Sequence, residues 1–443
     1  MMLFRPLASF LSTDSASLLL RTASCVLVAA TAPLALELLV LTAGSLLPKR
    51  SRKKRIHPVV PIAPLALTVV VPAHNEELLL RRCVASLRAD LPPGSSVLVV
   101  AHNCTDATAR VAAEAGAEVL MLRDDGRRGK GAALRAGFNH AVARGAKVLA
   151  VVDADSVVAP GFSAVIVEAL ADGAEAFQTR YVAAGSGSQA TAKLTALGFL
   201  GFNVIRPRGR ARLGMSAGIF GNGFGLRSTV LQRVPYEASS VVEDLEYHLR
   251  LVDAGIRVAF LEGASVLSEM PQNSAAASSQ RARWEGGRLC MARAWLLRLL
   301  QRTLAGRPIL LEPALELACL PLASEVVLLG IGLLLPVPRL RIYAAGAFAI
   351  ILMHVATAAA EGDGWWSAVR TLLSVPRYIV WKLGMLPRTL ASSQRDAAWV
   401  RTSREAAPAP APATVTPIDR GQRPLKNAVG GRIVAGLGKG RRR

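Results

Sequence analysis

Two carboxylates, Asp153 and Asp155, stand one residue apart directly after a short apolar run, residues 148–152. A short, valine-containing run bounded by polar residues predicts a buried strand of a parallel sheet, and ligands bind where such strands end. Carboxylate oxygens are the ligands that Mg²⁺ and Mn²⁺ prefer. The pair therefore predicts a site for Mg²⁺ or Mn²⁺, although aspartate is also common in ordinary turns after strands.

A second acidic pair, Glu243 and Asp244, begins a segment whose apolar residues have helical spacing. A carboxylate within hydrogen-bond reach of a hydroxyl can accept its proton, so Asp244 is a candidate general base. Acidic residues also favour the first turn of a helix, because they interact with the positive end of its dipole. On the sequence alone, both interpretations remain open.

Basic residues near these acids could stabilise a departing diphosphate. Lys130 lies in a basic, glycine-flanked stretch, residues 127–131, just before a predicted helix. A helix N-terminus with free N–H groups and a nearby cation suits a diphosphate. Arg283 follows Gln280 by three residues and precedes Trp284. Arg283 could serve the same diphosphate or form a cation–π pair with Trp284 at a membrane surface.

Strands and helices alternate in the first part of the chain. The predicted strands are residues 65–72, 97–101, 118–122 and 148–152, and helical patterns follow the first three. This order is typical of an open, mostly parallel nucleotide-binding sheet, whose loops lie at one edge. Further on, a glycine-dense turn around Asn222 and Gly223 permits close backbone approach to a ligand, but fits a plain hairpin equally well.

Together, these motifs resemble those of the inverting family 2 nucleotide-sugar glycosyltransferases, and the resemblance spans roughly residues 65–290. Within this family, the motifs are similar to those of membrane enzymes of the cellulose-synthase and poly-N-acetylglucosamine-synthase kind. The resemblance implies an α/β fold, a Rossmann-like GT-A domain with flanking transmembrane α-helices. It also implies transfer of a sugar with inversion from a nucleotide-sugar, expected to be a UDP-sugar, to a lipid-linked or growing polysaccharide acceptor in cell-surface or exopolysaccharide synthesis.

The resemblance assigns roles residue by residue. It implies that the donor is bound by Pro72, His74, Asn75, Glu76, Lys130 and Asp153. It implies that the metal ligands are Asp155 and Asp153 and that the catalytic pair is Asp244 with Glu243. The residues that it puts at the acceptor and the diphosphate are Asn222, Gly223, Gln280, Arg283 and Trp284.

Two positions depart from the family's pattern. This chain has Ala101 and His102 where many relatives carry an aspartate that contacts the donor base, and Val242 where the family often has threonine. The first departure weakens the prediction of a uracil base and leaves the metal ligands and the general base intact. It also keeps a second interpretation open, in which the chain is a catalytically inactive membrane sensor or partner that binds a nucleotide or nucleotide-sugar.

Long apolar segments flank the motifs. Residues 22–47, 314–335 and 342–360 are long enough to cross ~30 Å of hydrocarbon as helices. The basic cluster in residues 49–55 marks the cytoplasmic side. We therefore predict a multi-pass protein of the inner (plasma) membrane with a cytoplasmic catalytic domain. Residues 371–386 are interrupted by proline and basic residues, so we expect this segment to lie in the membrane interface.

Three acids, Glu37, Glu316 and Glu325, lie within or beside the predicted spans. Acids at such positions face the interior of a helix bundle. We expect them either to border the path of a lipid acceptor or to bond with one another between helices.

The predicted organisation has four parts. They are an N-terminal anchor with its basic segment (1–56), the glycosyltransferase domain (57–300), transmembrane and interfacial helices (301–402) and a disordered basic tail (403–443). The net charge of +22 lies largely beside apolar segments and at the C-terminus, so it favours membrane lipids over nucleic acid as partners. Three spans offer little material for a polymer channel, so we expect either an enzyme that transfers a single sugar or one that has other membrane proteins of polysaccharide assembly as partners.

Overall fold

The structure is a computed structural model that describes residues 13–49, 66–124, 129–184, 190–269, 274–362 and 364–393. These residues belong to one compact unit of the chain. The predicted tail (403–443), most of the basic cluster in residues 49–55, and residues 127 and 128 of the glycine-flanked stretch lie outside the described residues.

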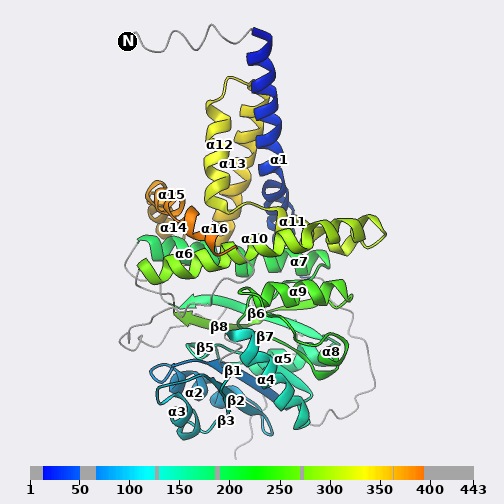
Figure 1. The fold of residues 1–443 in the computed structure, drawn as a ribbon, viewed down its shortest axis with the longest axis vertical. Helices are drawn as coiled ribbons and strands as arrows, with labels where there is room; N and C mark the ends of the chain where they lie inside the picture. Colours follow the sequence, from blue (N-terminus) through cyan, green and yellow to red (C-terminus); the bar gives the residue numbers. More distant parts are fainter. Residues whose placement is uncertain are drawn as a thin grey trace, which may run out of the picture. The chain divides into compact units, whose positions relative to one another are not determined.

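An eight-stranded sheet with strand order β3-β2-β1-β4-β7-β6-β8-β5 forms the centre of the catalytic region (Figure 1). The four predicted strands are confirmed, and they are β1 (Leu67–Ala73), β2 (Ser96–His102), β3 (Glu118–Leu122) and β4 (Val148–Val151). They pair in parallel. Their carboxyl ends therefore meet at one edge, as the alternating pattern predicts.

The second half of the sheet is mixed. Its strands are β5 (Ser156–Val158), β6 (Ala176–Ala184), β7 (Phe224–Arg227) and β8 (Val258–Glu269). Strand β7 is antiparallel to both of its neighbours, β4 and β6, and β5 is antiparallel to β8, whereas β6 and β8 are parallel. The sheet is thus less parallel than its first half suggests.

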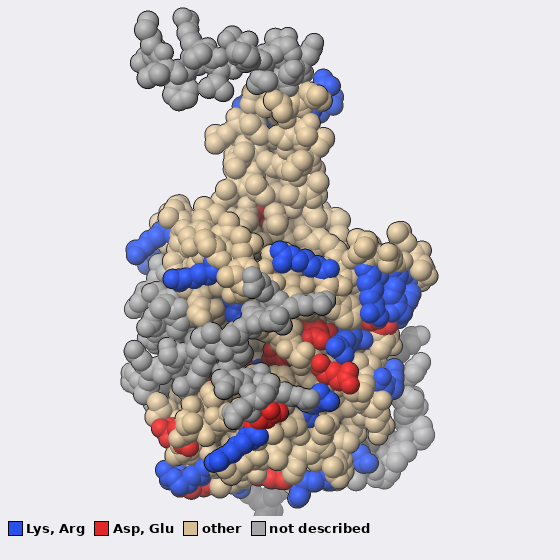
Figure 2. Space-filling model, viewed as in Figure 1, with Lys and Arg blue, Asp and Glu red and all other residues tan. Residues whose placement is uncertain are grey.

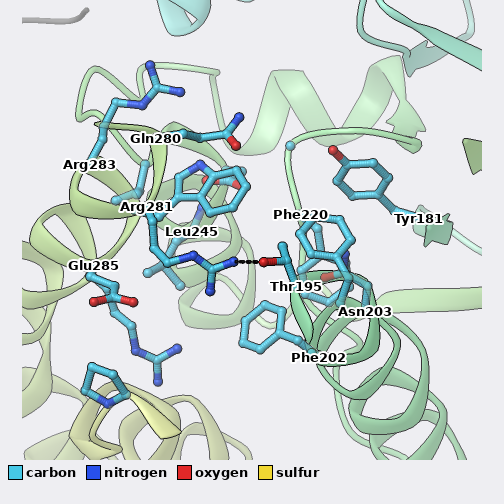
Figure 3. Close-up of a pocket in the computed structure, with 18 of the residues that line it drawn as sticks. Tyr181, Thr195, Phe202, Asn203, Phe220, Leu245, Gln280, Arg281, Arg283 and Glu285 are labelled. Atoms are coloured by element: carbon cyan, nitrogen blue, oxygen red, sulfur yellow. Dashed lines mark hydrogen bonds between the residues drawn. The ribbon is translucent and has the colours of Figure 1, made fainter. Parts of the chain in front are cut away.

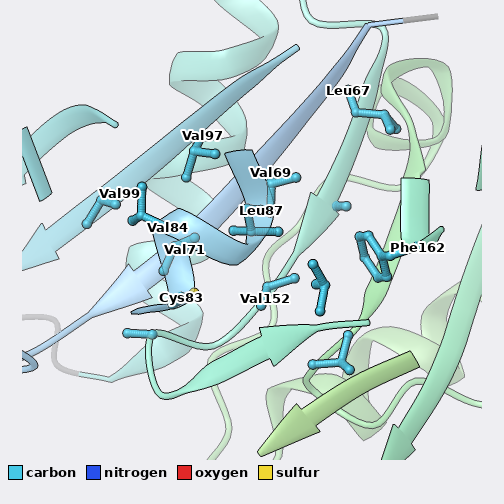
Figure 4. Close-up of a cluster of buried hydrophobic side chains, with 14 of the residues drawn as sticks. Leu67, Val69, Val71, Cys83, Val84, Leu87, Val97, Val99, Val152 and Phe162 are labelled. Carbon is cyan, nitrogen blue, oxygen red and sulfur yellow. The ribbon is translucent and has the colours of Figure 1, made fainter. Parts of the chain in front are cut away.

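Apolar residues alternate between the two faces of the strands, and each face packs on helices. On β1, Val69 and Val71 belong to one buried cluster and Val70 to the other. Figure 4 shows the first cluster, where Leu87 from α2 and Phe162 from α5 approach the strands. The helices on this face are α2 (Leu80–Asp90), α3 (Thr108–Glu114) and α5 (Phe162–Ala171). Those on the opposite face are α4 (Lys130–Ala143), α8 (Ser228–Arg233) and α9 (Glu243–Asp253).

A layer of helices joins this α/β domain to the apolar helices. It consists of α6 (Ala190–Leu200), the π-helix η1 (Gly201–Ile205), α7 (Arg206–Leu213), α10 (Ser274–Leu304) and the 3-10 turn η2 (Pro308–Leu310). Leu249 of α9, Leu299 of α10 and Leu317 of α11 (Leu311–Ala318) share one buried cluster, so α10 packs between the domain and the apolar helices (Figure 1). Helix α10 continues past residue 300, the predicted end of the catalytic domain.

Among the described residues, two helices are long and apolar enough to cross a membrane, one within α1 (Thr13–Leu46) and the other α13 (Pro338–Ala359). The predicted span over residues 314–335 differs from the structure, which has α11 (Leu311–Ala318) and α12 (Leu322–Leu334) bent by 76°. The break falls at Pro321, whose ring lacks an N–H and pushes Leu320 out of the helical conformation. A third span exists only if this bent pair counts as one.

The surface of the apolar helices is suited to a lipid environment. Large apolar side chains are exposed along α1 and α13, among them Leu36, Leu39, Ile342 and Leu352. In the view of Figure 2 this column is uncharged over most of its height. The helices α14 (Trp365–Leu372), α15 (Val375–Gly384) and α16 (Leu386–Ala391) are each too short to cross ~30 Å of hydrocarbon.

The acids of the apolar helices have different surroundings. Glu37 pairs with Arg206 and Arg210 of α7, and Glu316 also pairs with Arg210. Glu325 is fully buried, and within the described parts of the chain neither of its carboxylate oxygens has a hydrogen-bond partner. Glu37 and Glu316 therefore tie the apolar helices α1 and α11 to the layer that contains α7.

The crossing of α1 and α7 leads to a stability prediction. A Cβ at Gly209 of α7 would lie 2.1 Å from the carbonyl oxygen of Leu41 in α1. Gly209→Ala should therefore force the helices apart and destabilise the protein by about 1–3 kcal/mol, lowering its melting temperature in detergent. The matched control is Gly346→Ala on α13, where an added Cβ meets nothing within 4 Å. Equal melting temperatures for the two variants would contradict the close crossing.

Candidate active site

A cavity of about 1180 Å³ lies where the carboxyl ends of the parallel strands face α10 and the apolar helices. All but three of the predicted site residues line it, namely Pro72, His74, Glu76, Lys130, Asp153, Asp155, Glu243, Asp244, Gln280, Arg283 and Trp284. Figure 3 shows Gln280, Arg281, Arg283 and Glu285 of α10 on one side, facing Tyr181, Thr195, Phe202 and Phe220 on the other. The exceptions are Asn75, Asn222 and Gly223.

Lys130 is held at the centre of the polar part of the cavity. Its ammonium lies 2.5 Å from Asp153 Oδ1 and donates to the Gly221 carbonyl at 2.6 Å. Lys130 begins α4 after Gly129, whose φ of 110° favours glycine. At Gly131 a Cβ would lie 2.6 Å from the Ala238 carbonyl oxygen, so a side chain there would push this loop from the helix start. The glycine-flanked stretch thus sets where the lysine lies.

The second acidic pair lies at the start of α9, as predicted. Asp244 Oδ1 accepts a hydrogen bond from the Leu245 N–H at 2.8 Å. Its Oδ2 faces Gly221, where a Cβ would come within 3.1 Å of it. Asp244 therefore satisfies a backbone donor of the first turn with one oxygen and keeps the other towards the cavity, so the two interpretations of this pair are compatible.

Burial raises the pKa of both carboxyls. The pKa of Glu243 is raised to about 7, by burial first and then by the charge of Asp244, against the attraction of Lys130. Burial also raises the pKa of Asp244, while the Leu245 N–H and Lys130 act in the opposite direction. Neighbouring acids whose pKa values are raised by burial are typical of catalytic sites.

These shifts predict an acid limb in the pH–rate profile. A general base must be deprotonated, so a raised pKa delays activity to higher pH. We expect the acid limb of kcat/KM to lie above the ordinary pH range of a carboxyl, because burial raises the pKa of Asp244. Glu243→Gln removes the neighbouring negative charge, so its acid limb should move to lower pH. A wild-type limb at the ordinary pKa of a carboxyl, about 4, would contradict the prediction.

The Asp153–Asp155 turn is fixed from below by Asn222. The Asp153 N–H donates to Asn222 Oδ1 at 3.1 Å, and Asn222 Nδ2 donates to Ser156 Oγ at 2.8 Å. Ser156 Oγ in turn donates to Asp155 Oδ1 at 2.9 Å. Asn222 is 1% exposed. It therefore positions the two carboxylates, and its predicted contact with an acceptor stays a prediction.

Gly223, next to Asn222, also lies beneath the cavity lining. Its φ is 72°, and a Cβ there would lie 2.2 Å from Thr179 Oγ1. Only glycine fits this turn, which delivers the chain into β7 beside β4. Contact of Gly223 with an acceptor likewise stays a prediction.

The two aspartates fit a divalent cation that shares its coordination with a substrate. Mg²⁺ is commonly held by one or two carboxylates together with phosphate oxygens. Across the described ranges, no group of three or more His, Cys, Asp or Glu residues could hold a metal alone. A cation on Asp153 and Asp155 would therefore need further oxygens, which a nucleoside diphosphate can supply.

The loop after β1 is held against the loop after β2. Asn75 adopts a φ of 57°, and its Oδ1 accepts from the Thr105 N–H at 2.8 Å. His74 Nδ1 donates to the His102 carbonyl at 2.8 Å. The side chain of His102 is buried and lines the cavity together with His74 and Glu76. Asn75 thus shapes the loop that presents the other predicted donor residues.

The predicted site residues all lie within a segment that matches a known family. The family described as "Glycosyltransferase like family 2" matches residues 64–287, which is half of the chain. The chain belongs to this family. It is a glycosyltransferase with a GT-A domain. The narrower resemblance to cellulose synthase and poly-N-acetylglucosamine synthase stays a prediction.

Individual relatives of this glycosyltransferase match shorter parts or the fold alone. Uncharacterized glycosyltransferases of Mycobacterium bovis and Mycobacterium tuberculosis are each 39% identical to it over 110 residues, 25% of this chain and 46% of theirs. The match thus spans about half the length of these relatives. A mannosyltransferase from Pyrobaculum calidifontis, solved in complex with GDP-Man and Mn²⁺, has a TM-score of 0.51 and 18% identity, covering 84% of this chain and 97% of its own. At that identity the likeness shows the fold.

Several cavity residues of the glycosyltransferase were missed by reasoning from the sequence. Arg281 lies inside the Gln280–Trp284 motif, so its position on α10 was an available signal. Tyr181 and Phe220 carried no such signal, because only the pairing of β6 and the course of the loop before β7 bring them to the cavity.

Proposed function

We propose that this glycosyltransferase transfers a sugar, with inversion, from a nucleotide-sugar to a lipid-linked or growing polysaccharide acceptor at the cytoplasmic face of the inner membrane. The observation that carries the proposal is the continuity of the cavity. From Asp153 and Asp244 the same cavity reaches apolar residues of α1, α12 and α13, including Leu34, Leu38, Leu322, Val326, Ile351 and Val355. A polar end suits the donor and an apolar end suits a lipid tail.

In the proposed reaction, Asp244 accepts the proton of an acceptor hydroxyl as that oxygen attacks the anomeric carbon. The bond to the nucleoside diphosphate breaks on the opposite face, which gives inversion in one displacement. Lys130 and Arg283, which line the same cavity as Asp244, stabilise the charge on the departing diphosphate. A divalent cation held by Asp153 and Asp155 would neutralise part of that charge when bound.

The donor base is the least constrained part of the proposal. His102 lies where the family often has an aspartate for the base, so UDP-sugars are the expected donors but not the only candidates. The Pyrobaculum mannosyltransferase was solved with GDP-Man. GDP-sugars therefore belong in any donor panel.

Membrane insertion is part of the same proposal. Its support is the two helices of spanning length, the bent pair α11–α12 and the exposed apolar side chains along α1 and α13. We further propose that α14–α16 lie in the membrane interface, because Trp366, Leu373 and Val380 are largely exposed. Membrane lipids and other polysaccharide-assembly proteins would then be its partners.

Donor turnover tests the proposed function. The full-length protein in lipid nanodiscs is given UDP- and GDP-sugars, native lipid extract as acceptor, and Mg²⁺ or Mn²⁺. We expect nucleoside diphosphate release from one donor, and chelation by EDTA should lower it roughly 100-fold or more until the metal is restored. Binding of a donor without any turnover would instead favour the inactive sensor.

A further inference from the structure

Arg281 differs from the other cations of the cavity in its partners. Its Nη1 donates to the Tyr378 hydroxyl at 2.9 Å, and its Nη2 donates to Thr195 Oγ1 at 3.3 Å (Figure 3 shows the bond to Thr195). The guanidinium also lies 5.9 Å from the centre of the Tyr378 ring. All three contacts are with neutral groups, and among the described residues no carboxylate pairs with Arg281.

The remaining cavity cations each face an acid. Lys130 pairs with Asp153, Arg206 with Glu37, Arg288 with Glu316 and Lys382 with Glu285. Arg283 is attracted by Glu243 and Asp244, although burial lowers its pKa. The positive charge of Arg281 is therefore the one in the described cavity that has no such match.

Arg281 and Lys382 are close enough to influence each other. Burial and, to a smaller extent, the charge of Arg281 together lower the pKa of Lys382 to about 7. In the described part of the cavity, the acid paired with one of these two cations is Glu285, which bonds Lys382. A partly desolvated site with excess positive charge favours an anion, because charges interact more strongly at low dielectric constant.

The position of Arg281 indicates which anion would reach it. Thr195 lies on α6 and Tyr378 on α15, so the guanidinium spans the junction of these helices with α10. The cavity residues near these two in the sequence include apolar ones. They are Leu194 and Leu197 on α6 and Val375 and Ile379 on α15. On α10, the polar cavity residues Gln280 and Arg283 lie on either side of Arg281 in the sequence. Arg281 thus lies at the boundary between the polar and apolar parts of the cavity.

We propose that Arg281, supported by Lys382, binds the phosphate or diphosphate group of an anionic lipid acceptor. This inference rests on the transferase function proposed above. A guanidinium can donate two parallel hydrogen bonds to phosphate oxygens, and the hydroxyls of Tyr378 and Thr195 fix its orientation. The apolar part of the cavity then holds the lipid chain.

The phosphate is a binding group in this proposal and not the nucleophile. A phosphate monoester is already largely ionised at neutral pH and needs no general base. Asp244 instead serves a hydroxyl on a sugar attached to the lipid diphosphate. The lipid acceptor would therefore be held at its phosphate by Arg281 and deprotonated at its sugar by Asp244.

The test measures binding to the full-length protein in detergent micelles, without turnover. The ligands are farnesyl diphosphate, farnesol and inorganic diphosphate, with UDP and GDP as probes of the donor site. Arg281→Gln should weaken the affinity for farnesyl diphosphate about 10-fold or more and leave that for farnesol unchanged. Arg281→Lys should lose less, because it keeps the charge. Inorganic diphosphate should bind the wild type far more weakly than farnesyl diphosphate.

Arg298→Gln is the matched control, since Arg298 lies on the same helix, pairs with Asp253 and does not line the cavity. Unchanged farnesyl diphosphate affinity in Arg281→Gln would overturn the proposal. Equal weakening for farnesol would mean a structural effect, and equal weakening for UDP or GDP would put Arg281 in the donor site; either result also overturns it. If Arg281→Gln does not fold, Tyr378→Phe must weaken farnesyl diphosphate binding selectively. Failure of the proposed function would appear in turnover and not here.

Discussion

Replacing Asp244 by asparagine should lower kcat by roughly 10³-fold while the donor affinity stays near that of the wild type. The amide oxygen can still accept the hydrogen bond from the Leu245 N–H that Asp244 Oδ1 accepts at 2.8 Å. The start of α9 therefore stays intact. The amide cannot take a proton from an acceptor hydroxyl, so the loss falls on the chemical step. Nucleoside diphosphate release and calorimetric donor binding measure the two quantities separately.

Glu243→Gln is the decisive companion variant. It removes the negative charge of the neighbouring acid. It leaves in place the hydrogen bond from the Leu245 N–H to Asp244 Oδ1. We expect a smaller loss of kcat than for Asp244→Asn, together with the shifted acid limb described above. A larger loss in Glu243→Gln would move the general base to Glu243, and a loss of donor affinity in both would show that the pair binds the donor.

The second large effect is expected at Arg210, which is fully buried where α7 meets α1 and α11. Its guanidinium lies 2.5 Å from Glu312 Oε1, 3.0 Å from Glu316 Oε2 and 3.1 Å from Glu37 Oε1. Burial works against the charged form, but the three carboxylates more than offset it and hold the pKa of Arg210 above its ordinary value. Arg210 is thus a cation shared by three buried acids, of which Glu37 also pairs with Arg206 and Glu316 with Arg288.

Arg210→Met should destabilise the protein by about 3–5 kcal/mol, because it removes the cation that three buried acids share and leaves a charge imbalance in a buried site. The melting temperature in detergent should fall by roughly 5–10 °C. The double variant Arg210→Met/Glu312→Gln should recover part of the loss, since it removes one of the unpaired charges.

Arg233→Met is the control for Arg210. Arg233 pairs with Glu175 at 2.5 Å, but both side chains are about half exposed, 51% and 44%. Such a surface pair contributes at most about 1 kcal/mol. If Arg210→Met lowered the melting temperature no more than Arg233→Met does, the buried cluster would not be what joins α7 to the apolar helices.

Local sequence patterns determined the first half of the fold. Strands β1 to β4 are short, apolar and bounded by polar residues, so their positions followed from periodicity and the turns that bound them. The same patterns placed Asp153 and Asp155 after a strand and Glu243 and Asp244 at a helix start, because these placements depend on neighbours in the chain. The order of these motifs also carried the resemblance to the family that the chain belongs to.

Other features depended on contacts between residues far apart in the chain. Strand β7 inserts antiparallel between β4 and β6, a register that no local pattern encodes. Asn222 lies under the Asp153 turn because its side-chain oxygen accepts a hydrogen bond from the backbone of Asp153, 69 positions away. The bend at Pro321 divides an apolar segment whose hydropathy alone predicts one straight span.

The same holds for the charges. The sequence alone placed Glu37 and Glu316 among apolar residues, but it did not show their partners, the arginines of α7. Arg206 is 169 positions from Glu37, and Arg210 is 102 positions from Glu312. Likewise, the sequence shows an arginine at position 281, but it does not show that the neutral partners of this arginine are Thr195 and Tyr378, which come from two other helices. Residue types and their local order thus determined which chemistry is available. Tertiary packing decided which charges are neutralised within the protein and which face a ligand, because pairing energies depend on distance and burial in the folded chain.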